Sequence, residues 1–308
     1  MLRYYAKKSF NEEPQLVKEP PIERAWIYGN RVTSDELSKV GEHYSLNTGI
    51  LRDVLDLNEL PRLEYTQGVL YVFVRTPHRS QRSNISTAPF LAILKGSLLV
   101  TLSTKDYVEP AELFKRSNTG MKSSKHIFLQ LLGQVIYQYQ TYISASGDNI
   151  RGTERRLRTH DVDTRDFINF VTVETELNEF RTNLTAIDVV LRRIGENKHA
   201  LFNEKELEYI EDIVLQCQQL LVASESHLNL ADSIRNAYSA IANNTMNLRM
   251  KKLTLLTLLV ALPNVFFGMY GMNVMLPIAD EPWAYYAVTG ISLLIVTVVA
   301  LFVRKIKY

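Results

Sequence analysis

Residues 243–273 read NNTMNLRMKKLTLLTLLVALPNVFFGMYGMN, and this stretch decides how the chain is organised. It contains an apolar run from Leu253 to Tyr270, interrupted every three or four residues by a polar or small side chain. On a helix such positions fall on one face. We call this set the polar stripe: Asn243, Asn247, Met250, Thr254, Thr257, Ala261, Asn264, Gly268 and Gly271.

The stripe has two interpretations. A helix in lipid gains nothing by showing amides and hydroxyls to acyl chains, so the stripe must face another helix or water. Small and polar residues help membrane helices to pack, which is the first interpretation. The stripe is long for that purpose and carries three amides, which favours a pore lining contributed by several subunits around an axis. A ring of subunits with closed rotational symmetry would supply that pore.

A second apolar segment, Trp283–Val303, has no charged residue and is long enough to cross a bilayer core of about 30 Å. Basic residues lie before the first span and after the second, whereas the loop between them carries only the acids Asp280 and Glu281. The positive-inside rule therefore predicts a cell-membrane protein with both termini in the cytosol. The basic residues are Arg249, Lys251, Lys252, Arg304, Lys305 and Lys307.

Upstream of the stripe, Asn203 is a plausible helix N-cap, and no proline follows until Pro263. The pattern predicts one helix from Asn203 to Tyr270, about 100 Å long, whose first part is a cytosolic stalk. The alternative is a helix broken by a hinge near Asn243 and Asn244.

The N-terminal part has the composition of a mixed α/β domain. Strands are predicted at 24–28, 69–75, 89–94 and 97–102, and helices at 34–43 and 47–57, which together favour an open sheet with helices packed on it. A helical hairpin follows at 125–158 and 165–194. The fold class is thus an α+β cytosolic domain with a long stalk helix and two transmembrane helices, in a membrane homo-oligomer. The predicted divisions are 1–124 (α/β domain), 125–202 (hairpin), 203–252 (stalk), 253–270 (first span), 271–282 (outer loop), 283–303 (second span) and 304–308 (basic tail).

Composition narrows the function. A net charge of +2 gives no reason to expect a nucleic-acid partner, and a single cysteine, Cys217, excludes an intrachain disulfide. No glycine-rich phosphate loop and no nucleophile with a paired base stands out, so we do not expect an enzyme.

Tyr270-Gly271-Met272-Asn273, at the end of the first of two C-terminal spans, resembles the signature of the CorA family of magnesium channels. The resemblance implies a homopentamer that passes divalent cations, mainly magnesium, into the cytosol. It implies a selectivity filter at Gly271, Met272 and Asn273, with Asp280 and Glu281 at the outer mouth. It also implies lower constrictions at Asn247, Met250 and the level of Leu253 and Thr254.

The resemblance further implies gating by intracellular magnesium, held between acids of neighbouring subunits. Asp212 on the stalk matches the level of one such acid, and Asp106, Glu109 and Glu112 are candidate partners. A solvated stalk face explains Asp212 equally well.

The sequence departs from the family pattern in two places. The loop 274–281 lacks the Met-Pro-Glu-Leu run of many members, and Asn264 stands where threonine is commoner. A transporter of zinc, cobalt or nickel with the same architecture therefore stays open. So does a membrane-anchored coiled-coil scaffold, which would conduct nothing.

Overall fold

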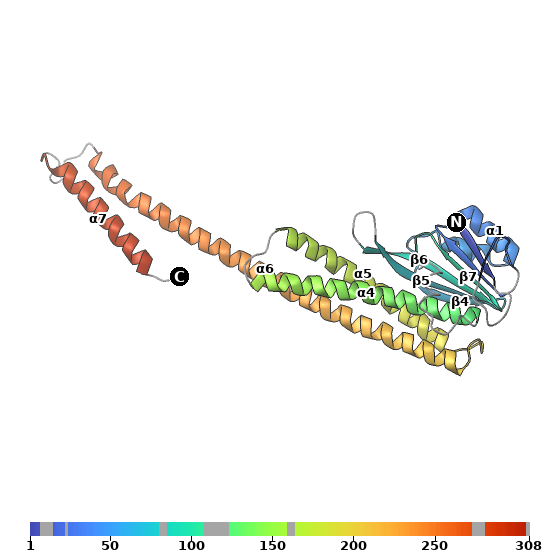
Figure 1. Ribbon diagram of the computed structural model, residues 1–308. Helices are drawn as coiled ribbons and strands as arrows, with labels where there is room; N and C mark the ends of the chain where they lie inside the picture. Colours follow the sequence, from blue (N-terminus) through green and yellow to red (C-terminus); the bar gives the residue numbers. More distant parts are fainter. Residues whose placement is uncertain are drawn as a thin grey trace. The chain divides into compact units, whose positions relative to one another are not determined.

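The computed structural model describes residues 1–6, 15–21, 24–79, 85–107, 123–158, 164–272 and 281–305 (Figure 1). Contacts divide the chain into two units, residues 1–234 and 235–308, and the boundary falls within one long helix.

The first unit is built on a seven-stranded sheet with the order β2-β1-β3-β7-β6-β5-β4. Its neighbouring strands are antiparallel except for β3 and β7, which are parallel. The strands are β1 (Leu2–Ala6), β2 (Gln15–Val17), β3 (Ala25–Asn30), β4 (Arg62–Thr66), β5 (Val69–Arg79), β6 (Ile85–Lys95) and β7 (Leu98–Ser103). Gln67 and Gly68, both at positive φ, make the two-residue turn that joins β4 to β5.

Helices cover both faces of the sheet. Ile27, Phe73 and Val100 point to one face and form a core with α1 (Ser34–Tyr44) and α2 (Thr48–Asp53). The other face contacts α4 (Ser124–Arg158) and α5 (Thr164–Gly195). Because both faces are buried, the central strands are nearly continuous apolar runs, such as Val69–Val74.

The N-terminal part of α6 (Glu204–Tyr270), as far as Ile234, packs within the same unit. Asn203 caps it: Oδ1 accepts the backbone N–H of Glu206 at 3.0 Å, and Glu206 Oε2 accepts the N–H of Asn203 at 3.0 Å. Its buried residues recur every three or four positions: Ile210, Ile213, Cys217, Leu220, Ser224, Leu228, Ala231 and Ile234. One side of the stalk therefore belongs to the hydrophobic core of the first unit.

Most predicted elements are present, and several differ. The four predicted strands, the capped start of α1 and the helical hairpin are confirmed. The hinge near Asn243 is absent, because α6 is a single helix to Tyr270. The prediction missed β1, β2 and β4, which lie at or near the two edges of the sheet.

The helix predicted at 47–57 was too long, since α2 ends at Asp53. Beyond it, Val54, Leu55 and Asp56 donate to carbonyls three residues back, so the chain tightens into a 3₁₀-type turn. Asp56 Oδ1 then accepts the N–H of Asn58 at 2.9 Å, which ends the helical path.

The second unit consists of the remainder of α6 and α7 (Ala284–Lys305). By length and composition, α6 and α7 each contain an 18-residue window apolar enough to cross a membrane, with mean hydropathy 1.8 and 2.1. The chain thus combines a sheet-containing soluble domain, a long helix and a C-terminal helix that could span a membrane.

Candidate functional site: the polar stripe of α6

All residues of the polar stripe are exposed in the single chain. The residues of α6 that lose part of their exposure in this region are others, Leu255, Leu259, Leu262, Pro263 and Phe266. At 3.6 residues per turn, these half-buried positions lie on roughly the opposite side of the helix from the stripe. Within one chain, therefore, the stripe is not a packing face.

The buried face of α7 accounts for the half-buried residues on the other side of α6. Ala284, Val288 and Ser292 are buried and follow each other at intervals of four residues, so they form one face of α7. Within the second unit the only other described helix is α6, so its half-buried apolar face is the surface available to cover these residues. This α7 face was not predicted. Its signal was the small residues Ala284 and Ser292 eight positions apart, of the kind that lets membrane helices approach closely.

The hydroxyls of the stripe are satisfied by their own helix. Thr254 Oγ1 donates to the carbonyl of Met250 at 2.9 Å, and Thr257 Oγ1 donates to the carbonyl of Leu253 at 2.9 Å. Each hydroxyl oxygen can still act as an acceptor, because donating uses only its hydrogen. A row of such oxygens can accept from the water shell of a cation without leaving a donor unpaired.

The stripe ends where α6 ends. Gly271 donates its backbone N–H to Phe267 at 3.0 Å and Met272 donates to Met269 at 3.2 Å, so the last turn tightens from i−4 to i−3 bonding. Gly271 does not adopt a positive φ, and a Cβ there would lie 3.3 Å from the carbonyl oxygen of Phe267. Met272 and Glu281 are exposed, and Asn273 and Asp280 lie outside the described residues.

The residues predicted to take part in gating are not brought together within one chain. Asp212 is exposed on α6. The Asp106 carboxylate accepts hydrogen bonds from Nε and Nη2 of Arg31 and from the side-chain amide of Asn30. The hydrogen bond from Arg31 is the main cause that lowers the pKa of Asp106. Glu109 and Glu112 lie outside the described residues. In the part of the chain that the structure describes, no cluster of three or more His, Cys, Asp or Glu side chains could hold a metal ion.

Comparison with known proteins identifies the family of this chain. The model of the family described as "CorA-like Mg2+ transporter protein" matches residues 23–305. This chain belongs to the CorA family. A cobalt/magnesium transport protein CorA from Methanocaldococcus jannaschii is 23% identical over 289 residues, which cover 91% of this chain and 90% of that protein. Another cobalt/magnesium transport protein CorA, from Thermotoga maritima, is 19% identical over 292 residues, which cover 89% of this chain and 80% of that protein.

Solved structures agree on the fold of this CorA family member. The complete CorA magnesium transporter from Methanocaldococcus jannaschii superposes with a TM-score of 0.85 at 20% identity, covering 100% of this chain and 98% of that one. The full-length CmaX protein superposes with a TM-score of 0.74 at 17% identity, covering 97% of each chain. These comparisons show the family and the fold of the chain.

Proposed function

We propose that this CorA family member assembles as a ring, expected to be a homopentamer, and conducts magnesium into the cytosol through a pore lined by α6. The observation that carries the proposal is the exposure of the whole polar stripe on the side of α6 away from α7. A stripe that stays exposed in the described part of the chain is available to face a symmetry axis. Repeated around that axis, it gives a continuous polar wall.

The residues of the stripe suit a hydrated cation. Magnesium gives up its water reluctantly, so a pore that accepts hydrogen bonds from the water shell conducts it more readily than one that strips the shell. Asn243, Asn247, Thr254, Thr257 and Asn264 offer amide and hydroxyl oxygens for this purpose. Met250, Ala261 and Gly268 set the width of the pore between them.

The outer mouth of the proposed pore is the segment that follows α6. Gly271, Met272 and Asn273 would form the selectivity filter, with the amide of Asn273 presented as a ring to the entering ion. Asp280 and Glu281 would add a ring of negative charge that concentrates cations at the entrance. With the basic residues at the two cytosolic helix ends, this charge pattern supports cytosolic termini in a cell membrane.

Regulation would use magnesium as well. Asp212 is exposed on the stalk and can therefore reach an acid of a neighbouring subunit. Two carboxylates from different subunits would hold the ion and keep the ring closed at high cytosolic magnesium. Asp106 is a poor partner, because Arg31 already occupies its carboxylate.

The decisive experiment is ion uptake into vesicles that contain only the purified full-length protein. We expect magnesium uptake driven by an inside-negative potential, and loss of most of it in Asn273→Ala. The matched control is Asn149→Ala, which removes an exposed asparagine from α4. Unchanged uptake in Asn273→Ala would remove Asn273 from the mechanism, and the absence of any potential-driven divalent flux would refute the channel.

Cobalt is the second candidate ion, because both curated relatives are named cobalt/magnesium transport proteins. The same vesicles, loaded with dyes for each metal, compare magnesium with cobalt, zinc and nickel. If magnesium at millimolar concentration fails to compete with micromolar cobalt, cobalt is the preferred substrate.

A further inference from the structure

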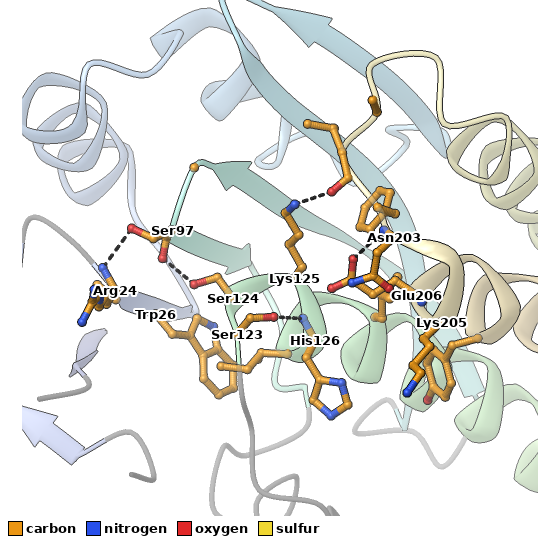
Figure 2. A pocket seen from close by; sticks show the side chains of 18 of the residues that line it. Arg24, Trp26, Ser97, Ser123, Ser124, Lys125, His126, Asn203, Lys205 and Glu206 are labelled. Carbon is orange, nitrogen blue, oxygen red and sulfur yellow. Dashed lines mark hydrogen bonds between the residues drawn. The ribbon is translucent and has the colours of Figure 1, made fainter. Parts of the chain in front are cut away.

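The first unit contains a cavity of about 980 Å³ that the proposed channel function does not use. Five separate parts of the chain line it: Tyr5 of β1, the start of β3, the β6–β7 turn, the start of α4, and the start of α6 with the residues before it. Figure 2 shows Arg24 and Lys205 on opposite sides of this space, with Ser123, Ser124 and His126 between them. Its size is within the range of cavities that hold small organic ligands, about 300–1,000 Å³.

The wall of the cavity is apolar. Trp26, Ile127, Leu129 and Phe202 line it, and each is at least 94% buried in the chain. Trp26 is held in place because its Nε1 donates to Thr101 Oγ1 at 2.8 Å. These four side chains form the buried floor of the cavity, and the half-buried side chains of Tyr5, Leu201 and Tyr209 supply the apolar surface that a ligand can reach.

The rim is positively charged. Among the described lining residues, Arg24, Lys125 and Lys205 are cationic and Glu206 is the one carboxylate. Glu206 is already used, since it accepts the N–H of Asn203 in the cap of α6. Lys125 donates to the carbonyl of Leu201, whereas Arg24 and Lys205 have no carboxylate partner among the described residues.

Two helix N-termini add to this charge. α4, of 35 residues, and α6, of 67 residues, both begin at the cavity. Their caps, Ser123 and Asn203, each accept one first-turn N–H, from His126 and Glu206. The remaining first-turn N–H groups and the positive end of each helix dipole favour an anion.

We infer that this cavity binds a small phosphorylated molecule with an apolar body, such as a nucleotide, with its phosphates between Arg24 and Lys205 and its body against Leu201 and Tyr209, above the floor that contains Trp26. Cationic side chains and helix N-termini recognise the phosphates, and the apolar wall recognises the body. The inference does not depend on the proposed channel function, because it concerns binding to the first unit alone.

The test uses the full-length protein in detergent and Trp26 as the reporter. The chain has two tryptophans, so Trp283→Phe leaves Trp26 as the single emitter beside the cavity. Titration with ATP in EDTA is expected to change the Trp26 emission saturably, and calorimetry is expected to give one site per chain. Arg24→Gln and Lys205→Gln should each weaken binding about tenfold. Arg181→Gln, which removes an exposed arginine from α5, should not.

Two further ligands separate the parts of the site. Adenosine lacks the phosphates and tripolyphosphate lacks the apolar body, and each should bind at least about tenfold more weakly than ATP. The inference fails if ATP does not bind, or if the Arg24 and Lys205 variants bind it as tightly as the parent. It also fails if adenosine binds as tightly as ATP, since the cations then contribute nothing to the affinity. Tripolyphosphate that binds as tightly as ATP would likewise refute the role of the apolar wall.

Discussion

Glu179 on α5 and Thr87 on β6 are joined by two hydrogen bonds to a single carboxylate oxygen. Glu179 Oε1 accepts the backbone N–H of Thr87 at 3.0 Å and its hydroxyl at 2.5 Å. Asn183, one turn further along α5, donates to the same Thr87 hydroxyl oxygen at 3.0 Å. Thr87 is buried, so this polar network fixes where α5 lies on the sheet.

Glu179→Ala should therefore destabilise the first unit by about 1–3 kcal/mol, because it leaves a buried N–H and a buried hydroxyl without their acceptor. The measurement is urea unfolding of the full-length protein in detergent, followed by Trp26 emission in the Trp283→Phe background. Glu225→Ala is the control, since Glu225 is exposed on α6. Equal losses in the two variants would show that Glu179 contributes no more than a surface glutamate.

Glu176 should make the same unit sensitive to pH. The residue is 8% exposed, and this burial is the main cause that raises its pKa. The hydrogen bond from the Ile85 N–H at 2.7 Å opposes the rise, whereas the negative charge of Glu179 adds to it. A pKa that is raised on folding means that the folded chain binds the proton more tightly than the unfolded chain. The resulting stability is complete below the unfolded pKa and is lost as pH rises through the folded pKa.

Glu176→Gln keeps the acceptor for Ile85 but cannot ionise. The stability of the parent relative to this variant should consequently fall as pH rises from about 4 to about 7. Unfolding midpoints of both proteins across this range measure the difference. A parent that gains stability over Glu176→Gln with rising pH would contradict the assigned direction of the shift.

Two glycines of α4 provide a matched pair. A Cβ on Gly147 would lie 2.4 Å from His227 Nε2 on α6, whereas a Cβ on Gly152 would lie 3.7 Å from its nearest neighbour, Arg156. Gly147→Ala should therefore push α4 and α6 apart and lower the unfolding midpoint. Gly152→Ala should stabilise the protein by about 0.5–1 kcal/mol, because alanine is the better helix former. A gain in both variants would show that His227 moves aside at no cost.

Hydrophobic pattern predicted the helices and central strands well, because these elements bury one or both faces. The edge strands were missed for a physical reason: Arg62-Leu63-Glu64-Tyr65-Thr66 in β4 is only half-buried, and its Arg62 and Glu64 side chains form an ion pair at 2.6 Å. On the stalk, Ile213 and Leu220 are buried, whereas the equally apolar neighbours Val214 and Leu221 are only half-buried. Hydrophobic periodicity predicts the spacing of the buried residues, whereas the helices that pack against the stalk determine which of its faces is buried.

The polar stripe could be predicted from sequence because it lies on one continuous helix. The cavity at Trp26 could not, because its cations Arg24, Lys125 and Lys205 come from segments far apart in the chain. The partner of Asp212 could not be predicted either, because the proposed partner belongs to a second copy of the chain.

If the proposed regulation holds, Asp212→Asn weakens the closure of the proposed channel by cytosolic magnesium. In vesicles with magnesium set independently on the two sides, the variant should continue to conduct at cytosolic-side concentrations that stop the parent, because one carboxylate ligand is lost. Glu211→Gln is the control, since Glu211 is the exposed neighbouring acid on α6. If both variants are inhibited like the parent, Asp212 is a solvated stalk residue.

Leucine substitutions in the stripe should separate a pore from a scaffold. Asn264→Leu and Thr257→Leu each replace a polar side chain by an apolar one, which would remove an acceptor for ion-bound water and narrow the proposed pore. We expect magnesium uptake to fall by at least about tenfold in each variant, which corresponds to about 1.4 kcal/mol in the barrier to conduction. Uptake into vesicles is the measurement, with the amount of inserted protein determined in the same samples.

Thr297→Leu on α7 is the matched control for this experiment. Its hydroxyl donates to the carbonyl of Leu293 at 2.7 Å, as Thr257 donates to Leu253, and it is exposed in the single chain, but it is not part of the stripe. A pore on α6 requires uptake to survive in Thr297→Leu and to fall in Thr257→Leu. Were all three variants to conduct like the parent, the stripe would not face the ion path, and a packing role for its amides and hydroxyls would be the better explanation.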